Sequence, residues 1–242
     1  MTGVQTCALP IYSLESVKEI GRTTAAVIIE PIQGEAGVRK ADEAFLHALR
    51  KVCDEHCVLL IFDEIQTGFG RTGSLFHFEH YKALIPDILV VAKGMGGGLP
   101  IGAFISSNRI MSCLTTNPVL GHINTFGGNA VCVAAARATL DVILDEKLSA
   151  RAKEIEKVIL KHLKHPLIKE LRVHGALGAI DFLDEALNMR VIKACIEHGV
   201  ISDWFLFCPT AMRIAPPLTI TDQELLEAIE KIKSVLVGIE KG

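Results

Sequence analysis

The stretch PDILVVAKGMGGGLPIGA, residues 86–103, decides the class of fold. A short apolar run, residues 87–92, ends at Lys93 and leads directly into a glycine-rich turn. Two similar runs precede it, residues 25–30 and residues 58–62, and a segment with helical periodicity separates these two. Short apolar runs alternating with helical segments predict buried strands joined by helices. The sequence therefore predicts an α/β fold with a mostly parallel sheet.

The pattern changes after a charged helix that begins near residue 147. Further helices and strands are expected as follows: helices over 41–57, 128–144, 147–163, 186–198 and the C-terminal residues, and strands over 102–106, 171–182 and 212–215. Residues 128–144 are apolar almost all round, which predicts a buried helix. Thr221 and Glu224 form a capping box for the last helix. We expect a partial large domain over 12–145 and a C-terminal α+β small domain over 146–242.

Composition excludes several classes of protein. The 242 residues are 50% hydrophobic and 22% charged, with 25 basic and 28 acidic side chains, so neither a disordered chain nor a nucleic-acid binder is indicated. The longest apolar run, residues 130–136, is too short to span a membrane. Seven scattered cysteines favour a reducing, cytoplasmic location. No metal site is expected, because Cys53, His56 and Cys57 fall on a helix-period stretch.

The first residues, MTGVQTCALPI, fit neither a signal peptide nor a transit peptide. Back-translated with a GTG start codon, they resemble a common sequencing adapter. We therefore interpret residues 1–11 as an artefact and exclude them from the fold.

Three predicted strands end in ionisable residues: Glu30, Asp63 and Lys93. In open parallel sheets, ligands bind beyond the carboxyl ends of the strands. A lysine there can form a Schiff base with an aldehyde cofactor, and an acid can keep a heterocyclic nitrogen protonated, as pyridoxal phosphate chemistry requires. The same residues also suit strands that reach solvent, or a structural ion pair, so both interpretations stay open on spacing alone.

A competing pattern lies at Gly68, Gly70 and Gly73, which satisfy GxGxxG. A dinucleotide-binding fingerprint needs these glycines at the turn from a strand into a helix. Here residues 63–67 intervene, and the next segment, SLFHFEHY, lacks a helical apolar period. A dinucleotide-dependent oxidoreductase is therefore disfavoured.

Five motifs, in order along the chain, resemble the class III aminotransferases, and most closely the acetylornithine and ornithine aminotransferase group. They are EPIQGEAGV (30–38), IFDEIQTGFGRTG (61–73), PDILVVAKGMGGGLPIGA (86–103), NTFGGN (124–129) and MRIAPPL (212–218). The resemblance implies the type I fold of pyridoxal-phosphate-dependent transferases, with pyridoxal 5'-phosphate as cofactor. It covers only the later part of a family chain, so we expect an N-terminally truncated fragment.

The resemblance also assigns roles to the cofactor-binding residues. Lys93 matches the lysine that binds the cofactor covalently and shuttles a proton, and Asp63 matches the carboxylate that pairs with the pyridinium nitrogen. Ile65 would pack on the ring, and Gln66 matches a residue near its phenolic oxygen. Thr125 matches a residue that reaches the phosphate of the neighbouring subunit's cofactor, which implies a homodimer.

For the substrate, Arg213 matches the arginine that binds a carboxylate, and Glu35 the acid that pairs with it in ornithine-type members. The implied reaction is ping-pong transfer of an amino group from acetylornithine, ornithine or a similar ω-amine to 2-oxoglutarate. Two alternatives remain: an aminomutase of the same fold, of the glutamate-1-semialdehyde type, and an inactive fragment.

Overall fold

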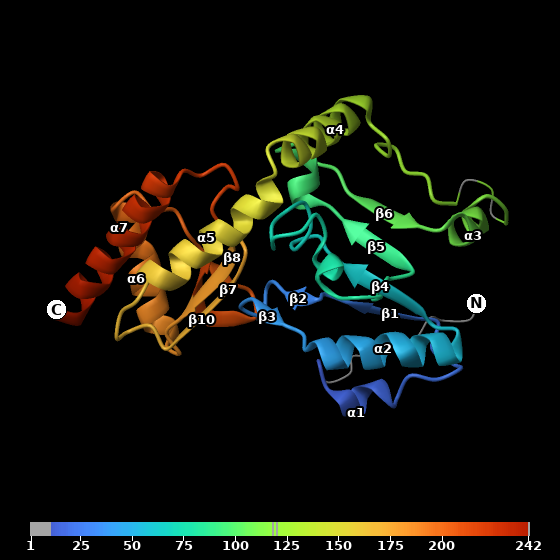
Figure 1. Cartoon of the computed structure of the whole chain (residues 1–242), viewed down its shortest axis with the longest axis horizontal. Helices are drawn as coiled ribbons and strands as arrows, with labels where there is room; N and C mark the ends of the chain where they lie inside the picture. The colour runs from blue at the N-terminus through green and yellow to red at the C-terminus, as the bar shows by residue number, and fades with distance from the viewer. Residues whose placement is uncertain (1–10, 118, 120, 242) are drawn as a thin grey trace.

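The computed structural model describes residues 11–117, 119 and 121–241. Two four-stranded sheets lie side by side, each with its own helices, and the chain passes from the first to the second along α4 and α5 (Figure 1). Strands β2 and β3 form a separate two-stranded sheet. Residues 1–10 of the proposed artefact lie outside the described residues, and Ile11 is exposed. The elements of the first half are α1 (Leu14–Val17), β1 (Ala26–Ile29), β2 (Ile32–Gln33), β3 (Arg39–Lys40), α2 (Glu43–His56), β4 (Leu59–Asp63), η1 (His77–His80), β5 (Ile88–Val91), η2 (Lys93–Gly96), β6 (Ala103–Ser106), α3 (Asn108–Met111), η3 (Ser112–Leu114) and α4 (Ala130–Asp145).

The first sheet has the strand order β1-β4-β5-β6. The β1–β4 and β4–β5 pairs are parallel and β5–β6 is antiparallel, which confirms a mostly parallel sheet. Helix α2 packs against β4 through Phe45, Leu46, Leu49 and Cys53, all buried. These positions share one face of a 3.6-residue helix, so the apolar period both forms the helix and directs it toward the sheet.

The second sheet is antiparallel throughout, in the order β7-β8-β10-β9. Helix α5 packs against β7 and α7, and α6 packs against β10 and α7. The capping box is confirmed: Glu224 N donates to Thr221 Oγ1, and Thr221 N donates to the Glu224 carboxylate. The elements of this half are α5 (Leu148–His162), β7 (Glu170–His174), β8 (Leu177–Asp181), α6 (Glu185–Glu197), β9 (Trp204–Phe205), β10 (Cys208–Ile214) and α7 (Asp222–Lys241).

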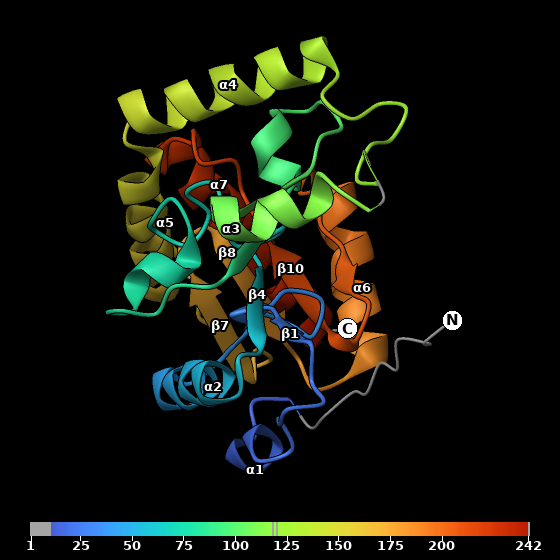
Figure 2. The ribbon, with the colours of Figure 1, turned by 90° about the vertical axis from the view of Figure 1, so that its right-hand side faces the viewer.

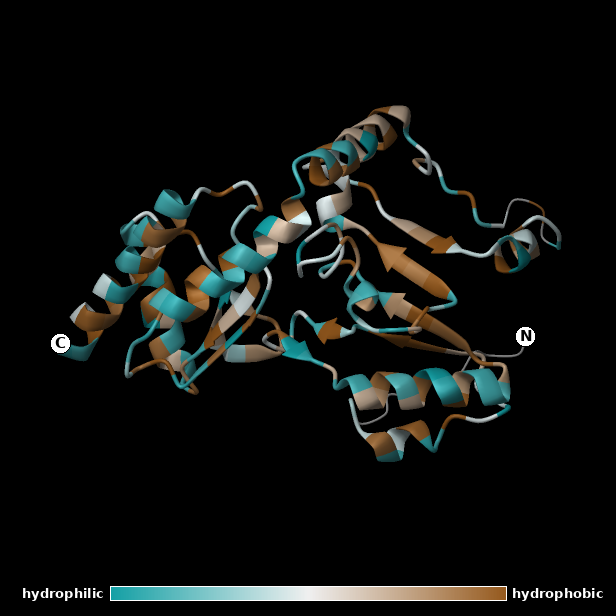
Figure 3. Cartoon of the chain, viewed as in Figure 1, coloured by the Kyte–Doolittle hydropathy of each residue, from teal (hydrophilic) through white to brown (hydrophobic). Residues whose placement is uncertain are grey.

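The helix expected over residues 128–144 is present as α4, but the expectation that it is buried is wrong. Only Ala136 and Ile143 are buried on it, whereas Val131 is 68% exposed. Helix α4 lies along one side of the molecule, and its contacts are with η2 and α5 (Figures 2 and 3). A helix that is apolar all round needs neighbours all round, and the described chain covers only part of its surface.

A partly buried arginine joins the two halves of the chain. Arg71 Nη1 donates to the carbonyl oxygens of Ala176 at 3.2 Å and Pro216 at 2.6 Å, and Ala176 N donates to Arg71 O at 2.8 Å. Gly175, with φ of 64°, brings the β7–β8 turn so close that a Cβ there would lie 2.4 Å from Arg71 O. The position of a domain boundary near residue 145 stays a prediction.

The six cysteines among the described residues are all free thiols. In the same part of the chain, no group of His, Cys, Asp and Glu side chains could hold a metal ion. No helix there is both long enough and apolar enough to cross a bilayer.

We expect Ile155→Ala to destabilise the chain by about 2–5 kcal/mol, because Ile155 of α5 is fully buried and truncation would leave a cavity. Urea unfolding followed by circular dichroism measures this change. The matched control is Leu160→Ala on the same helix, where 43% of the residue is already exposed. Equal losses for the two variants would contradict the packing of α5 described above.

Candidate active site

The carboxyl ends of three neighbouring strands bring ionisable side chains to one edge of the first sheet. Glu30 follows β1, Asp63 ends β4, and Lys93 lies two residues beyond β5. The register pairs Ile29 with Phe62 and Asp63 with Val90. Parallel pairing therefore places both residues at the same edge of the sheet, with Lys93 three residues beyond the partner of Asp63.

Lys93 has an unusual backbone conformation. Its φ is 43°, in the left-handed region that residues with a side chain seldom adopt. The residue is exposed and opens the single turn η2, and among the described residues it makes no ion pair. Strained conformations of this kind occur preferentially at functional sites, so the lysine is a candidate for chemistry rather than for a structural salt bridge.

Asp63 is half-buried and positioned by its own turn. Ile65 N donates to Asp63 Oδ1 at 3.0 Å, which fixes the carboxylate at the strand end. Beside it, burial raises the pKa of Glu30, the Gly34 N–H opposes that shift, and the nearby Asp63 carboxylate adds to it. The Lys93 charge lowers the Glu30 pKa. Glu30 therefore interacts electrostatically with both Asp63 and Lys93 at this edge of the sheet.

A second cluster joins Glu35, Gln66 and Arg213. Arg213 Nη2 donates to both Glu35 carboxylate oxygens, at 2.9 and 3.0 Å. Gln66 bridges the pair, because its Nε2 donates to Glu35 Oε1 at 3.0 Å and its Oε1 accepts from Arg213 Nη1 at 3.3 Å. The structure thus brings together three residues that the family motifs single out.

The surroundings hold this cluster in place. The Arg213 guanidinium lies 4.5 Å from the centre of the Phe205 ring, a cation–π contact. Burial would raise the pKa of Glu35, but the hydrogen bonds from Arg213, Leu206 N and Gln66 lower it below its ordinary value. Glu35 is therefore a carboxylate at neutral pH.

The β2–β3 turn carries Glu35 to Arg213. Gly34 N donates to Glu30 Oε2 at 2.9 Å, so the turn is tied to the end of β1. A Cβ on Gly34 would lie 2.5 Å from Gln66 Cδ, which explains why glycine is needed there. On the other side, Phe207 N donates to Glu35 O at 3.0 Å.

Ile65 and Thr125 are the remaining residues expected at the site. Ile65 is half-buried in the turn after Asp63. Thr125 lies on the exposed segment before α4, and no described contact joins it to Lys93 or Asp63. Residue patterns alone do not single out Phe205, since it belongs to none of the five motifs.

Sequence reasoning also missed the support given by Glu64, the residue after Asp63. Glu64 is fully buried, and its carboxylate accepts from His77 N at 2.5 Å, Phe78 N at 2.8 Å and Thr67 Oγ1 at 3.1 Å. Burial raises the pKa of Glu64 to about 7, against the effect of these donors. The Glu64 side chain thereby fixes the long connection after β4. The only sign of this role in the sequence is a second acid directly after Asp63.

A model of the family described as aminotransferase class-III matches residues 2–236. The chain therefore belongs to the class III aminotransferases, whose cofactor is pyridoxal 5'-phosphate. This confirms the family resemblance and the fold expected from it.

Within that family, the chain is similar to solved ornithine and acetylornithine aminotransferases. It is 36% identical to acetylornithine aminotransferase from Elizabethkingia anophelis, with a TM-score of 0.84 over 95% of this chain and 59% of that one. It is 35% identical to ornithine aminotransferase from Toxoplasma gondii ME49, with a TM-score of 0.85 over 97% of this chain and 57% of that one. The chain thus spans less than two thirds of the length of these structures.

The residues at the sheet edge suit this cofactor. The carboxylate ends one strand, and the amine follows the end of the adjacent parallel strand. Such a separation suits a ring that carries an aldehyde and a pyridinium nitrogen on opposite sides. Lys93 is exposed and makes no ion pair among the described residues, and Asp63 engages Ile65 N through only one of its oxygens. Among the described residues, the two groups do not form an ion pair with each other.

The Glu35–Arg213 pair should make the stability of the chain depend on acidity. Because the folded-state pKa of Glu35 is lowered from 4.5, its contribution is complete above pH 4.5 and is lost as the pH falls through the lower, folded value. We expect Glu35→Gln to cost about 1 kcal/mol at pH 7 and progressively less below pH 4.5. Urea unfolding from pH 3.5 to 7 measures the difference.

The control for this experiment is Glu19→Gln, an exposed glutamate outside the site. A constant difference between Glu35→Gln and the parent chain across this pH range would show that the pair does not contribute as described.

Proposed function

We propose that this protein is a pyridoxal-phosphate-dependent aminotransferase that moves the amino group of an ω-amine, such as ornithine or acetylornithine, to 2-oxoglutarate in a ping-pong reaction. The observation that carries the proposal is the edge of the first sheet, where Asp63 ends β4 and Lys93 follows the end of the adjacent parallel strand β5. The family and the similarity to acetylornithine and ornithine aminotransferases support it.

The family motifs support the role proposed for each of these side chains. The cofactor, when bound, supplies a ring that withdraws electrons from the amino-bearing carbon of the substrate. Lys93 Nζ would hold the cofactor covalently and would move the proton at that carbon, while Asp63 would pair with the protonated ring nitrogen. Ile65 would pack on the ring, and Gln66 would stand near its phenolic oxygen.

Arg213 is proposed to bind the substrate carboxylate, since a planar guanidinium can donate two parallel hydrogen bonds to it. Glu35 now occupies that guanidinium through both of its oxygens. When Glu35 stays on Arg213, the pocket favours an ω-amino donor, and when it leaves, the arginine accepts the dicarboxylate 2-oxoglutarate. One pocket can thereby serve both halves of the reaction.

A homodimer is part of the proposal. Thr125 would reach the phosphate of the cofactor in the second subunit. Support comes from the apolar surface around it: Phe126 is 81% exposed, Val131 is 68% exposed, and both lie on the segment leading into α4 and on α4 itself. A second copy of this chain would cover these side chains.

The test of the chemistry uses Lys93→Ala. The parent chain is incubated with pyridoxal phosphate, reduced with borohydride and digested, and mass spectrometry locates the pyridoxyl group. We expect modification at Lys93 and its loss in the variant, together with a fall of at least about 100-fold in glutamate formation from ornithine and 2-oxoglutarate.

Lys193→Ala, an exposed lysine on α6, is the matched control and should keep both properties. Modification of the Lys93→Ala variant at an unchanged level would overturn the assignment. Amino-group transfer that needs no added 2-oxo acid would favour the aminomutase.

We expect Val131→Asp to weaken self-association by placing a charge in the surface that a second copy covers. Light scattering coupled to size exclusion measures the mass of each species. The control is Ile201→Asp, which adds the same charge at a residue that is 91% exposed and outside α4. If both variants associate as the parent chain does, α4 is not the interface.

A further inference from the structure

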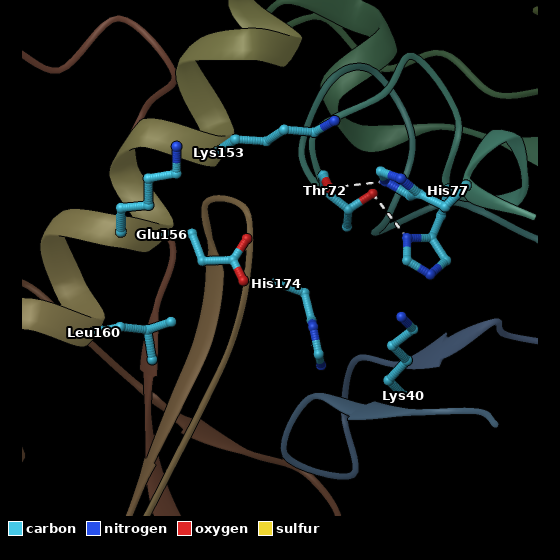
Figure 4. A pocket seen from close by; sticks show the side chains of 9 residues that line it. Lys40, Thr72, His77, Lys153, Glu156, Leu160 and His174 are labelled. Atoms are coloured by element: carbon cyan, nitrogen blue, oxygen red, sulfur yellow. Dashed lines mark hydrogen bonds between the residues drawn. The ribbon is translucent and has the colours of Figure 1, made fainter. Parts of the chain in front are cut away.

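A cavity of about 380 Å³ lies apart from the candidate active site, between the first half of the chain and helix α5. Figure 4 shows α5 side chains on one side, Lys40, Thr72 and His77 on the other, and His174 between them. None of its lining residues belongs to the Lys93–Asp63 edge or to the Glu35–Arg213 cluster. The lining residues are Lys40, Thr72, His77, His80, Lys153, Glu156, Lys157, Leu160 and His174.

The charge of this cavity is unbalanced. Lys40, Lys153 and Lys157 make no ion pair among the described residues. The one carboxylate of the lining, Glu156, accepts a hydrogen bond from Gly175 N at 2.9 Å. With neutral histidines, three ammonium groups and one carboxylate leave two positive charges, which a divalent anion would neutralise.

The ammonium groups come from separate elements, so the fold holds them together rather than a local run of lysines. Lys40 ends β3, whereas Lys153, Glu156, Lys157 and Leu160 follow the spacing of one face of α5. Lys153 also packs on the loop opposite: a Cβ on Gly73 would lie 2.7 Å from its Cε.

The histidines form a polar wall of the cavity, and the nearby lysine charge lowers their pKa. The ring nitrogens of His77 lie 3.0 Å from Thr72 Oγ1 and 3.1 Å from Tyr81 Oη, so this ring is fully engaged. Burial, reinforced by Lys40, lowers the pKa of His174 to about 4, and burial with His80 and Lys40 lowers that of His77 to about 3. Both rings are neutral at pH 7, and His174 can donate a hydrogen bond to a ligand.

We propose that this cavity binds a compact divalent oxyanion, the phosphate group of a phosphate monoester, through Lys40, Lys153 and Lys157. Lysines bind phosphate as point charges, and the three lysines of the described lining can approach a tetrahedral oxyanion from different sides. The site is separate from the candidate active site, and its occupant is not the cofactor held at Lys93.

The test is a titration of the full 242-residue chain with inorganic phosphate at pH 7.5 and constant ionic strength, followed by the ring signals of the histidines in NMR spectra. We expect saturable shifts of the His174 and His80 signals. The double variant Lys153→Gln/Lys157→Gln should bind phosphate at least about tenfold more weakly, because two of the three charges are lost.

Three comparisons decide the outcome. Lys193→Gln should bind like the parent chain, and so should Lys93→Ala, which separates this site from the proposed catalytic function. Unchanged His174 signals, or a folded double variant that binds phosphate normally, overturns the proposal. Tighter, lysine-dependent binding of succinate overturns the phosphate assignment. If the double variant does not fold, Lys40→Gln on β3 provides the same test from another element.

Discussion

The parallel pairing of β4 with β1 on one side and β5 on the other is the constraint on which the candidate site depends. Parallel strands end at the same edge of a sheet, so residues far apart in sequence meet there without any direct contact to hold them. Asp63 and Lys93 owe their neighbourhood to this pairing and not to a salt bridge. An amine and a carboxylate that lie at one sheet edge without forming an ion pair are both available to bind a ligand between them.

The second half of the site rests on contact between the two halves of the chain. Glu35 comes from the turn between β2 and β3 and Arg213 from β10, 178 positions later. The two hydrogen bonds from Arg213 and the one from Gln66 offset the desolvation of this partly buried carboxylate. Arg71 adds a separate tie through main-chain carbonyl groups of the second half.

Sequence patterns predict the elements of this fold better than their surroundings. The strands that end near Asp63 and Lys93 follow from short apolar runs, and the buried face of α2 follows from helical periodicity. Both are local properties of the sequence. The two-residue strands β2 and β3 are too short for any periodicity, and the exposure of α4 depends on what covers it, which no periodicity records. The pairing of Glu35 with Arg213 came from family motifs, and the cavity lysines from separate elements gave no signal at all.

Glu35 has a mechanical consequence as well as a chemical one. Its carboxylate links the turn after β2 to β10, so it fastens the first half of the chain to the second. A ligand carboxylate bound to Arg213 in place of Glu35 would replace this contact within the chain by a contact with the ligand. Ligand binding at Arg213 would thereby remove one link between the two halves, while the Arg71 hydrogen bonds to Ala176 and Pro216 would remain.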